Sequence, residues 1–225
     1  MDISELKLIP LFSELKEEDL EQIAKMTVRQ VYKKDNMVLI EEEVGSTMFV
    51  ILNGRVKISR ISDEGREVIL SILVDGDFFG EMSILDGQTR SANAVTLEDT
   101  ELLIIRRENF LLMLHSYPQV AINLLKELAH RLRRSDAQIK SLSLQNALGK
   151  VGSTLLRIAD DSGIIKQGKV EISQLPPQQD LANMAGTSRE TISRVIKSLG
   201  QLGYVKKEGS KLIILDYERF RQDFS

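Results

Sequence analysis

The predicted helix at residues 188–203 carries polar and apolar side chains on opposite faces. Its apolar residues recur at i, i+3, i+4 and i+7: Ile192, Val195, Ile196 and Leu199. This spacing is typical of a helix that buries one face. The opposite face carries charged and hydroxyl side chains: Arg189, Glu190, Ser193, Arg194 and Lys197. Arginine can donate two hydrogen bonds to guanine O6 and N7, and glutamate can accept one from cytosine N4, so these residue types can read base edges in a major groove.

The neighbouring sequence decides between this hypothesis and a merely solvated face, which is the usual role of charged helix positions. A helix-like segment at 178–185 comes before it, Gly186 falls at the turn, and Ser188 has the side chain of an N-cap. A basic segment at 204–216 follows and is predicted to be a β-hairpin that turns at Gly209. This order predicts a helix-turn-helix with a wing.

A second element is a long helix. No Gly or Pro interrupts the chain between Pro118 and Gly149. The stripe that could form a coiled-coil seam consists of Leu125, Leu128, Leu132, Ile139, Leu142 and Asn146. A single helix packed on its own domain would show a similar stripe, but the length favours dimerisation. We therefore expect a homodimer.

The first half of the chain is predicted to begin with two short amphipathic helices within residues 1–27. From Gln30 to about Arg106 short apolar runs alternate with turns rich in Asp, Asn and Gly; the runs are 38–40, 48–52, 68–74 and 101–105. Many short strands joined by tight turns are typical of an all-β roll or barrel.

Composition limits the class of protein. The 225 residues are 42% hydrophobic and 28% charged, which is typical of a globular protein. Cysteine is absent, and His115 and His130 are the only histidines, so no metal or cofactor is expected. No motif of a nucleophile elbow or metal-ligand set occurs, so an enzyme is not expected either.

The distribution of charge and the lack of targeting signals also agree with a DNA-binding protein. Residues 147–225 carry 12 Lys and Arg against 9 Asp and Glu, a net charge of +3, whereas residues 1–146 carry 18 against 24, or −6. Positive charge is thus concentrated at the predicted helix-turn-helix. The sequence has neither an apolar run of membrane-spanning length nor a signal-type N-terminus, so we expect a cytoplasmic protein without membrane contact.

The octapeptide Thr187-Ser188-Arg189-Glu190-Thr191-Ile192-Ser193-Arg194 resembles the recognition helix of the Crp/Fnr family of bacterial transcription regulators, and the resemblance extends to the end of the chain. It implies that Arg189, Glu190 and Arg194 contact bases. The side chains expected to position the protein on phosphates, which carry no sequence information, are Gln178, Gln179, Ser188 and Lys211. The two-fold axis of the expected dimer would impose a palindromic double-stranded DNA site, and we predict half-sites of the TGTGA type. The resemblance also implies RNA polymerase as a partner.

The segment FFGEMSILDGQTRSA at 78–92 resembles the phosphate-binding cassette of cyclic-nucleotide-binding domains. The resemblance implies that Arg90 pairs with a cyclic phosphate, that Ser91 adds a hydroxyl and an amide donor, and that Glu81 accepts from a ribose hydroxyl. Gly80 would let the backbone approach the sugar. The alternative is that Glu81 and Arg90 pair with each other and brace a turn.

On the long helix, Ser135 and Asp136 match the position at which nucleotide-responsive relatives contact the base. Polar residues between Leu132 and Ile139 interrupt the apolar seam, which indicates either register control, a ligand contact across the dimer or a solvated interruption. A carboxylate at 136 can accept from a purine amino group, so cyclic di-GMP is a rival to cAMP.

These observations predict an α+β fold with three parts: a β-roll ligand-binding domain at 1–115, a dimerisation helix at 116–146, and a winged helix-turn-helix DNA-binding domain at 147–225. The predicted function is that of a sequence-specific transcription regulator controlled by cAMP. The alternatives are the same DNA-binding role with another ligand such as cyclic di-GMP, or constitutive activity without a ligand.

Overall fold

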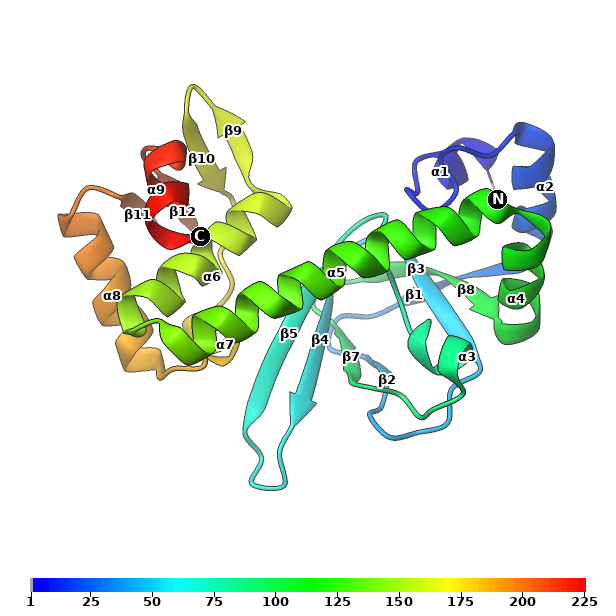
Figure 1. Ribbon diagram of the computed structural model, residues 1–225, viewed down its shortest axis with the longest axis horizontal. Coiled ribbons are helices and arrows are strands. Elements are labelled where there is room, and N and C mark those ends of the chain that lie inside the picture. Colours follow the sequence, from blue (N-terminus) through cyan, green and yellow to red (C-terminus); the bar gives the residue numbers. More distant parts are fainter. Residues whose placement is uncertain (1) are drawn as a thin grey trace. The chain divides into compact units, whose positions relative to one another are not determined.

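The computed structural model describes residues 2–225, which form two compact units that divide after Leu132. The first unit begins with two short helices, α1 (Ile3–Lys7) and α2 (Glu17–Lys25) (Figure 1). Asp2 caps α1 by accepting a hydrogen bond from the backbone N–H of Ser4, and three acidic residues stand in the first turn of α2, where the helix dipole favours them. The two helices expected at the N-terminus are confirmed.

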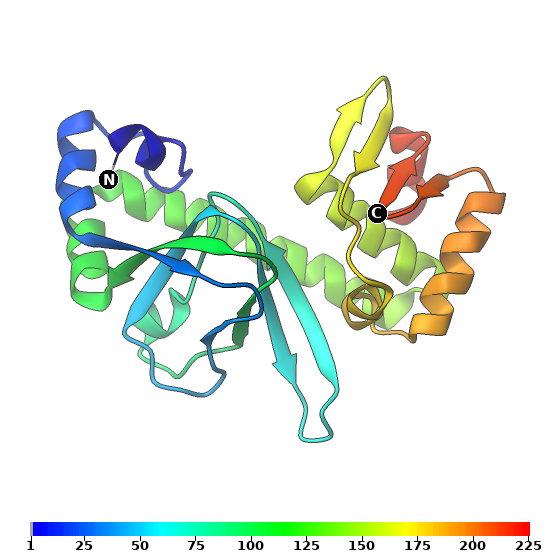
Figure 2. The ribbon, with the colours of Figure 1, turned by 180° about the vertical axis from the view of Figure 1, so that it is seen from behind.

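The strands of the first unit are β1 (Thr27–Tyr32), β2 (Met37–Leu39), β3 (Thr47–Asn53), β4 (Val56–Ile61), β5 (Glu67–Leu73), β6 (Phe78–Phe79), β7 (Asn93–Thr96) and β8 (Thr100–Arg106). They form two antiparallel sheets with the strand orders β1-β8-β3-β6 and β2-β7-β4-β5. Strand β1 pairs with β8, with Thr27 opposite Ile105 and Tyr32 opposite Thr100. Figure 2 shows the two strands side by side. This arrangement is the expected β-roll.

Two buried clusters hold the roll together. In the first, α1, α2 and helix α4 (Arg107–Ser116) pack against one sheet, with Phe12 and Phe110 fully buried. In the second, between the sheets, the rings of Phe49 and Phe79 stack with their centroids 5.1 Å apart. Neighbouring Phe78 belongs to the first cluster. Strand β6 is therefore anchored on both of its faces, which fixes the first two residues of the cassette.

Helix α5 (Pro118–Leu144) is the long helix predicted from the sequence. Val120 and Leu124 are buried, and Leu128 also packs against the first cluster of the roll. By contrast Leu125, Leu132 and Ile139, seven residues apart, are each more than 60% exposed. These three positions form an apolar stripe along one side of the helix.

Three members of the predicted stripe have other neighbours within the chain, and the seam itself stays a prediction. Leu128 packs against the roll, and Leu142 lies beside Gly186 of the second unit, where an added Cβ would come within 2.8 Å of its side chain. Asn146 lies beyond the end of α5 and caps the next helix by accepting from the backbone N–H of Gly149. Sequence periodicity alone does not separate these leucines from the exposed ones, because an amphipathic helix can have two apolar sides.

The second unit contains α6 (Ala147–Ser162), β9 (Ile164–Lys166), β10 (Lys169–Ile172), α7 (Gln178–Ala185), α8 (Arg189–Gln201), β11 (Val205–Glu208), β12 (Lys211–Ile214) and α9 (Tyr217–Phe224). Its sheet has the order β11-β12-β10-β9, and Figure 2 shows the two hairpins side by side. Phe220 and Phe224 of α9 are buried and pack against Tyr204. Helix α9 was not predicted.

The expected α+β fold with a roll, a long helix and a helix-turn-helix is confirmed. The proposed boundaries after residues 115 and 146 stay a prediction. Within residues 2–225, no helix combines the length and the apolar character that crossing a membrane requires.

Candidate ligand site and nucleic-acid interface

Arg90 is the centre of the candidate ligand site. Its guanidinium is buried and donates to the carbonyl oxygens of Gly80 and Thr47, each at 2.7 Å, to Ser83 Oγ at 2.8 Å and to Thr47 Oγ1 at 3.2 Å. Burial lowers the pKa of Arg90, although an arginine stays charged at neutral pH. The guanidinium thus links the segment between β6 and β7 to strand β3 through hydrogen bonds.

Two glycines make room for this side chain. A Cβ at Gly80 would lie 2.9 Å from the Nη1 atom of Arg90, and its φ of +79° is one that glycine adopts readily. At Gly45 a Cβ would overlap the guanidinium itself. Gly80 was predicted from its place in the cassette, whereas Gly45 lies in the loop before β3 and carries no local signal of its role.

Glu81 lies next to this site but does not take Arg90 as its hydrogen-bonding partner. Its carboxylate is buried and lies 3.4 Å from the guanidinium of Arg131 on α5. Burial raises the pKa of Glu81, and the charge of Arg131 opposes that shift. The alternative of a direct Glu81–Arg90 pair is therefore wrong for this structure.

Arg131 was not predicted from the sequence. Its guanidinium donates to the carbonyl oxygen of Phe78 at 2.7 Å and to Glu127 at 3.1 Å, and it lies 4.3 Å from the centroid of the Phe78 ring. The only signal in the sequence was its place in a basic stretch of the long helix. It adds a second guanidinium beside the cassette.

The middle of the cassette is a short helix, α3 (Met82–Asp86), and Gly87 after it has the left-handed conformation. Ser91 follows Arg90, is exposed, and its hydroxyl lies 3.5 Å from the sulfur of Met82. The structure therefore brings together the four residues predicted from the cassette: Gly80, Glu81, Arg90 and Ser91. Ser135 and Asp136 are exposed on α5 and belong to the second compact unit.

The predicted DNA-reading element has the expected local structure. Helix α7 ends at Ala185, and Gly186 after it turns the chain with a φ of +58°. Ser188 caps α8 by accepting from the backbone N–H of Thr191 at 3.2 Å. The predicted apolar face of α8 is confirmed as buried: Ile192, Val195, Ile196 and Leu199. A buried face of this size fixes which side of α8 remains available to a ligand.

The opposite side of α8 exposes all five predicted side chains: Arg189, Glu190, Ser193, Arg194 and Lys197. The pKa of Glu190 is lowered, first because its own backbone N–H at the helix start bonds the carboxylate and second because Ser188 does. Glu190 is therefore an ionised acceptor at neutral pH. Arg194 makes one long contact, 3.5 Å, with the hydroxyl of Thr191.

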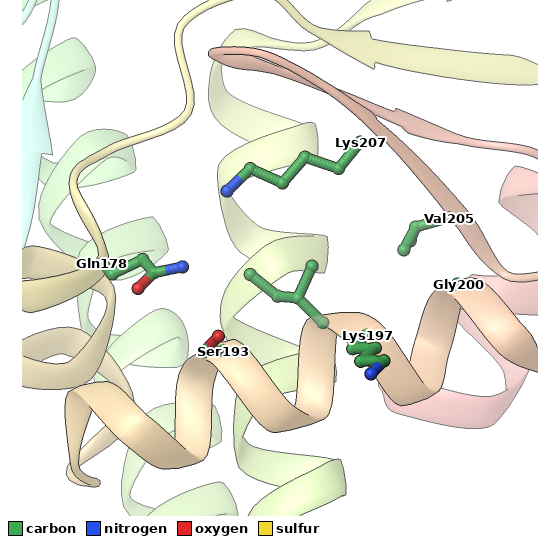
Figure 3. Close-up of a pocket in the computed structure, with 7 residues that line it drawn as sticks. Gln178, Ser193, Lys197, Gly200, Val205 and Lys207 are labelled. Atoms are coloured by element: carbon green, nitrogen blue, oxygen red, sulfur yellow. The ribbon is translucent and has the colours of Figure 1, made fainter.

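The predicted phosphate contacts have different surroundings. Gln179 donates to Asn183 at 3.0 Å, and Lys211 pairs with Glu171 at 3.0 Å. Gln178 is the first residue of α7 and lines a groove of about 260 Å³ with α8 and β11 (Figure 3). Lys207 lines the same groove and was not predicted.

The family models agree with this division of sites. A model of the cyclic nucleotide-binding domain matches residues 29–117, and a model of the Crp-like helix-turn-helix domain matches residues 149–222. A nucleotide-binding roll joined to a helix-turn-helix defines a class of DNA-binding regulators.

One relative and two solved structures that are similar to the chain narrow the class further. The cyclic AMP receptor protein of Thermus thermophilus is 36% identical over 201 residues, covering 89% of this chain and 90% of that protein. The crystal structure of the Thermus thermophilus catabolite activator protein is 33% identical, covers 95% and 97%, and has a TM-score of 0.55. The c-di-GMP-responsive regulator CLP of Xanthomonas campestris shares the fold, with a TM-score of 0.74 at 21% identity over 88% and 99% of the chains.

The chain belongs to the Crp/Fnr family of transcription regulators. Members of this family are DNA-binding regulators, and the roll of this chain is a domain of the cyclic-nucleotide-binding type.

Proposed function

We propose that this regulator is controlled by cAMP bound at the cassette. The observation that carries the proposal is the buried guanidinium of Arg90, held beside Glu81 and Ser91. A cyclic phosphate has one negative charge, which matches a bidentate guanidinium, and a buried carboxylate is an acceptor for the ribose hydroxyl. The Thermus relative is a cyclic AMP receptor protein, which supports the choice of ligand.

Binding of such a ligand requires a local rearrangement. Four hydrogen bonds from the two Nη atoms of Arg90 go to the cassette and to β3, and a guanidinium has five N–H groups in all. A phosphate that binds Arg90 bidentately must therefore replace at least one carbonyl or hydroxyl acceptor. We propose that this exchange alters the loop of Gly80 and Glu81 and so shifts the population of active protein.

The hinge between α5 and α6 is the element on which this shift acts. Helix α5 ends at Leu144 and α6 begins at Ala147. Within the second unit, Arg134 of α5 pairs with Asp161 of α6 at 2.5 Å, and Arg157 of α6 donates to Gln138 of α5 at 3.0 Å. These contacts hold one hinge arrangement, and ligand binding would favour the arrangement in which both recognition helices can face DNA.

The deciding experiment combines calorimetry with a gel-shift titration. The full chain is titrated with cAMP, cGMP and cyclic di-GMP, and its binding to a duplex with two inverted TGTGA half-sites is then measured with each nucleotide. We expect cAMP to bind and to strengthen DNA binding. A stronger response to cyclic di-GMP, the nucleotide to which the Xanthomonas regulator CLP responds, would identify the rival ligand. DNA binding that no nucleotide changes would indicate a constitutive regulator.

Asp136 provides a separate test of base selectivity. It is exposed on α5 midway between Leu132 and Ile139, so in a dimer it would lie close to the seam. If its carboxylate accepts from a purine amino group, Asp136→Ser should change the ratio of cAMP to cGMP affinity by about threefold or more. Isothermal titration of both nucleotides measures the ratio. An unchanged ratio would remove Asp136 from the ligand site.

We propose that the active form is a homodimer along α5. The stripe of Leu125, Leu132 and Ile139 is exposed at heptad spacing, and a solvent-exposed stripe of large apolar residues is unfavourable on an isolated helix. Two such stripes packed together would exclude water from all six side chains. A cytoplasmic dimer that recruits RNA polymerase is the further expectation from the family resemblance.

The substitution Leu132→Asp tests the dimer. A carboxylate at the middle of the seam would face its own copy in the partner, so we expect association to weaken at least about tenfold and DNA binding to fall with it, because two half-sites must be held together. Sedimentation should report a wild-type mass near twice 25.4 kDa and a smaller mass for the variant. The exposed Leu8 on the first unit offers a control, since Leu8→Asp should leave the mass unchanged. A wild-type monomer at micromolar concentration would contradict the seam.

A further inference from the structure

The groove between the recognition helix and the wing has the chemistry of an anion site. Its lining residues are Gln178 of α7, Ser193, Ile196, Lys197 and Gly200 of α8, and Val205 and Lys207 of β11. Two lysines, an amide and a hydroxyl are among them, and no carboxylate is. In Figure 3 the Lys207 side chain extends across the groove toward the side where Gln178 and Ser193 lie. Polar donors from three elements thus face one space.

Strand geometry explains why Lys207 reaches this groove and its neighbours do not. Side chains alternate along β11, so Lys207 shares a face with Val205, which is buried, whereas Lys206 and Glu208 are on the other face and pair with each other at 2.6 Å. In the register with β12, Lys207 is opposite buried Leu212 and Glu208 is opposite Lys211. Lys207 is therefore the wing lysine on the side of the sheet that packs against α8.

The same register places Lys211 on the far face. It shares that face with Lys206 and Glu208, and its ammonium pairs with Glu171 of β10 at 3.0 Å. Within residues 2–225, neither Lys207 nor Lys197 has a carboxylate within ion-pair distance, in contrast to Lys206 and Lys211. Two exposed and uncompensated positive charges therefore remain at the groove.

We propose that this groove binds a backbone phosphate of double-stranded DNA, with Lys207 as the principal charge, Gln178 and Ser193 as hydrogen-bond donors and Lys197 as a second cation. The proposal rests on the DNA-binding role of the chain and adds a contact that links the wing to the recognition helix. A recognition helix places its polar face in the major groove of the DNA. The sugar-phosphate backbone that borders the major groove then passes the edge of α8, next to the protein groove described above. A phosphate held there fixes the register of α8 without reading sequence.

Matched lysine substitutions on one strand test the proposal. Lys207→Gln and Lys206→Gln remove the same charge from adjacent residues, but only Lys207 lines the groove. Binding to a 30-base-pair duplex of random sequence and to the inverted-repeat duplex is measured by fluorescence anisotropy at several salt concentrations. For a dimer we expect Lys207→Gln to weaken both complexes about threefold or more and to flatten the slope of log K against log salt by about 2, whereas Lys206→Gln should change neither appreciably.

Two further variants complete the test. Lys207→Arg keeps the charge and should bind like the wild type, and thermal unfolding should show that every variant folds, since exposed lysines contribute little to stability. Gln178→Ala combined with Lys207→Gln should weaken binding by less than the product of the single effects, because both side chains hold the same phosphate.

The possible failures are distinguishable. Equal effects of Lys207→Gln and Lys206→Gln in a wild type that binds DNA would overturn the groove site and leave the regulator function intact. A loss confined to the inverted repeat would assign Lys207 to base recognition and overturn the phosphate contact. A wild type that binds neither duplex, with or without a nucleotide, would contradict the DNA-binding role and the groove together.

Discussion

Replacement of Arg90 by alanine is expected to reduce cAMP affinity by about 30-fold or more, equivalent to about 2 kcal/mol, because the bound phosphate would lose the guanidinium that pairs with it. The substitution also removes four hydrogen bonds that the guanidinium donates to Gly80, Ser83 and Thr47. Two backbone carbonyls would lose these donors, so we expect the free energy of unfolding to fall by about 1–3 kcal/mol. Calorimetric titration and thermal unfolding measure the two effects.

A control separates ligand binding from general destabilisation. Arg55 also belongs to the roll and pairs with Glu98 at 3.0 Å, outside the cassette. Arg55→Ala removes an equal charge and should leave cAMP affinity unchanged. Arg90→Lys retains the charge but not the fork of donors, and is expected to give an intermediate affinity. If Arg90→Ala binds cAMP as tightly as the wild type, the cassette is not the ligand site.

The parts of the fold with strong local signals could be predicted from the sequence. Helix α7 was placed at 178–185, as observed, and α8 carries the apolar spacing and the cap serine that define it. Strand β1 was missed because its four central residues, Val28 to Val31, are all exposed and show no alternation of apolar and polar side chains. These residues form a strand because they pair with β8, and their own sequence gives no strand signal.

The residues of the candidate sites also fall into two groups: those within a local motif and those that packing brings together. Arg90 and Glu81 could be predicted because both lie in the segment 78–92, which resembles a known cassette. Arg131 lies 50 residues from Glu81, and Lys207 is separated from Gln178 by the whole of α8. Their roles depend on packing between distant segments, which a single sequence does not reveal. Glu81 is an example: its ion-pair partner is Arg131 of α5, although Arg90 is closer to it along the sequence.

Replacement of Arg189 by alanine is expected to weaken binding to the specific palindrome far more than binding to random DNA. Arg189, Glu190 and Arg194 are exposed on the side of α8 opposite its buried face, and their spacing lets them reach neighbouring base pairs. A bidentate contact to guanine contributes about 1–3 kcal/mol of discrimination. A dimer makes this contact in two half-sites, so the specific complex should weaken by about 30-fold or more.

A comparison between duplexes distinguishes base reading from phosphate binding. Because the lost hydrogen bonds read one base pair, Arg189→Ala should lower affinity for the inverted repeat, relax the preference at one guanine of each half-site and change the salt slope little. Arg221 of α9 is also exposed and lies outside the predicted reading face, so Arg221→Ala is a charge-matched control that should retain the ratio of specific to random binding. Anisotropy measurements on the palindrome, on single-base variants of it and on a random duplex give these ratios directly. If Arg189→Ala weakens binding to the palindrome and to the random duplex by the same factor, Arg189 contacts a phosphate and the recognition-helix assignment fails.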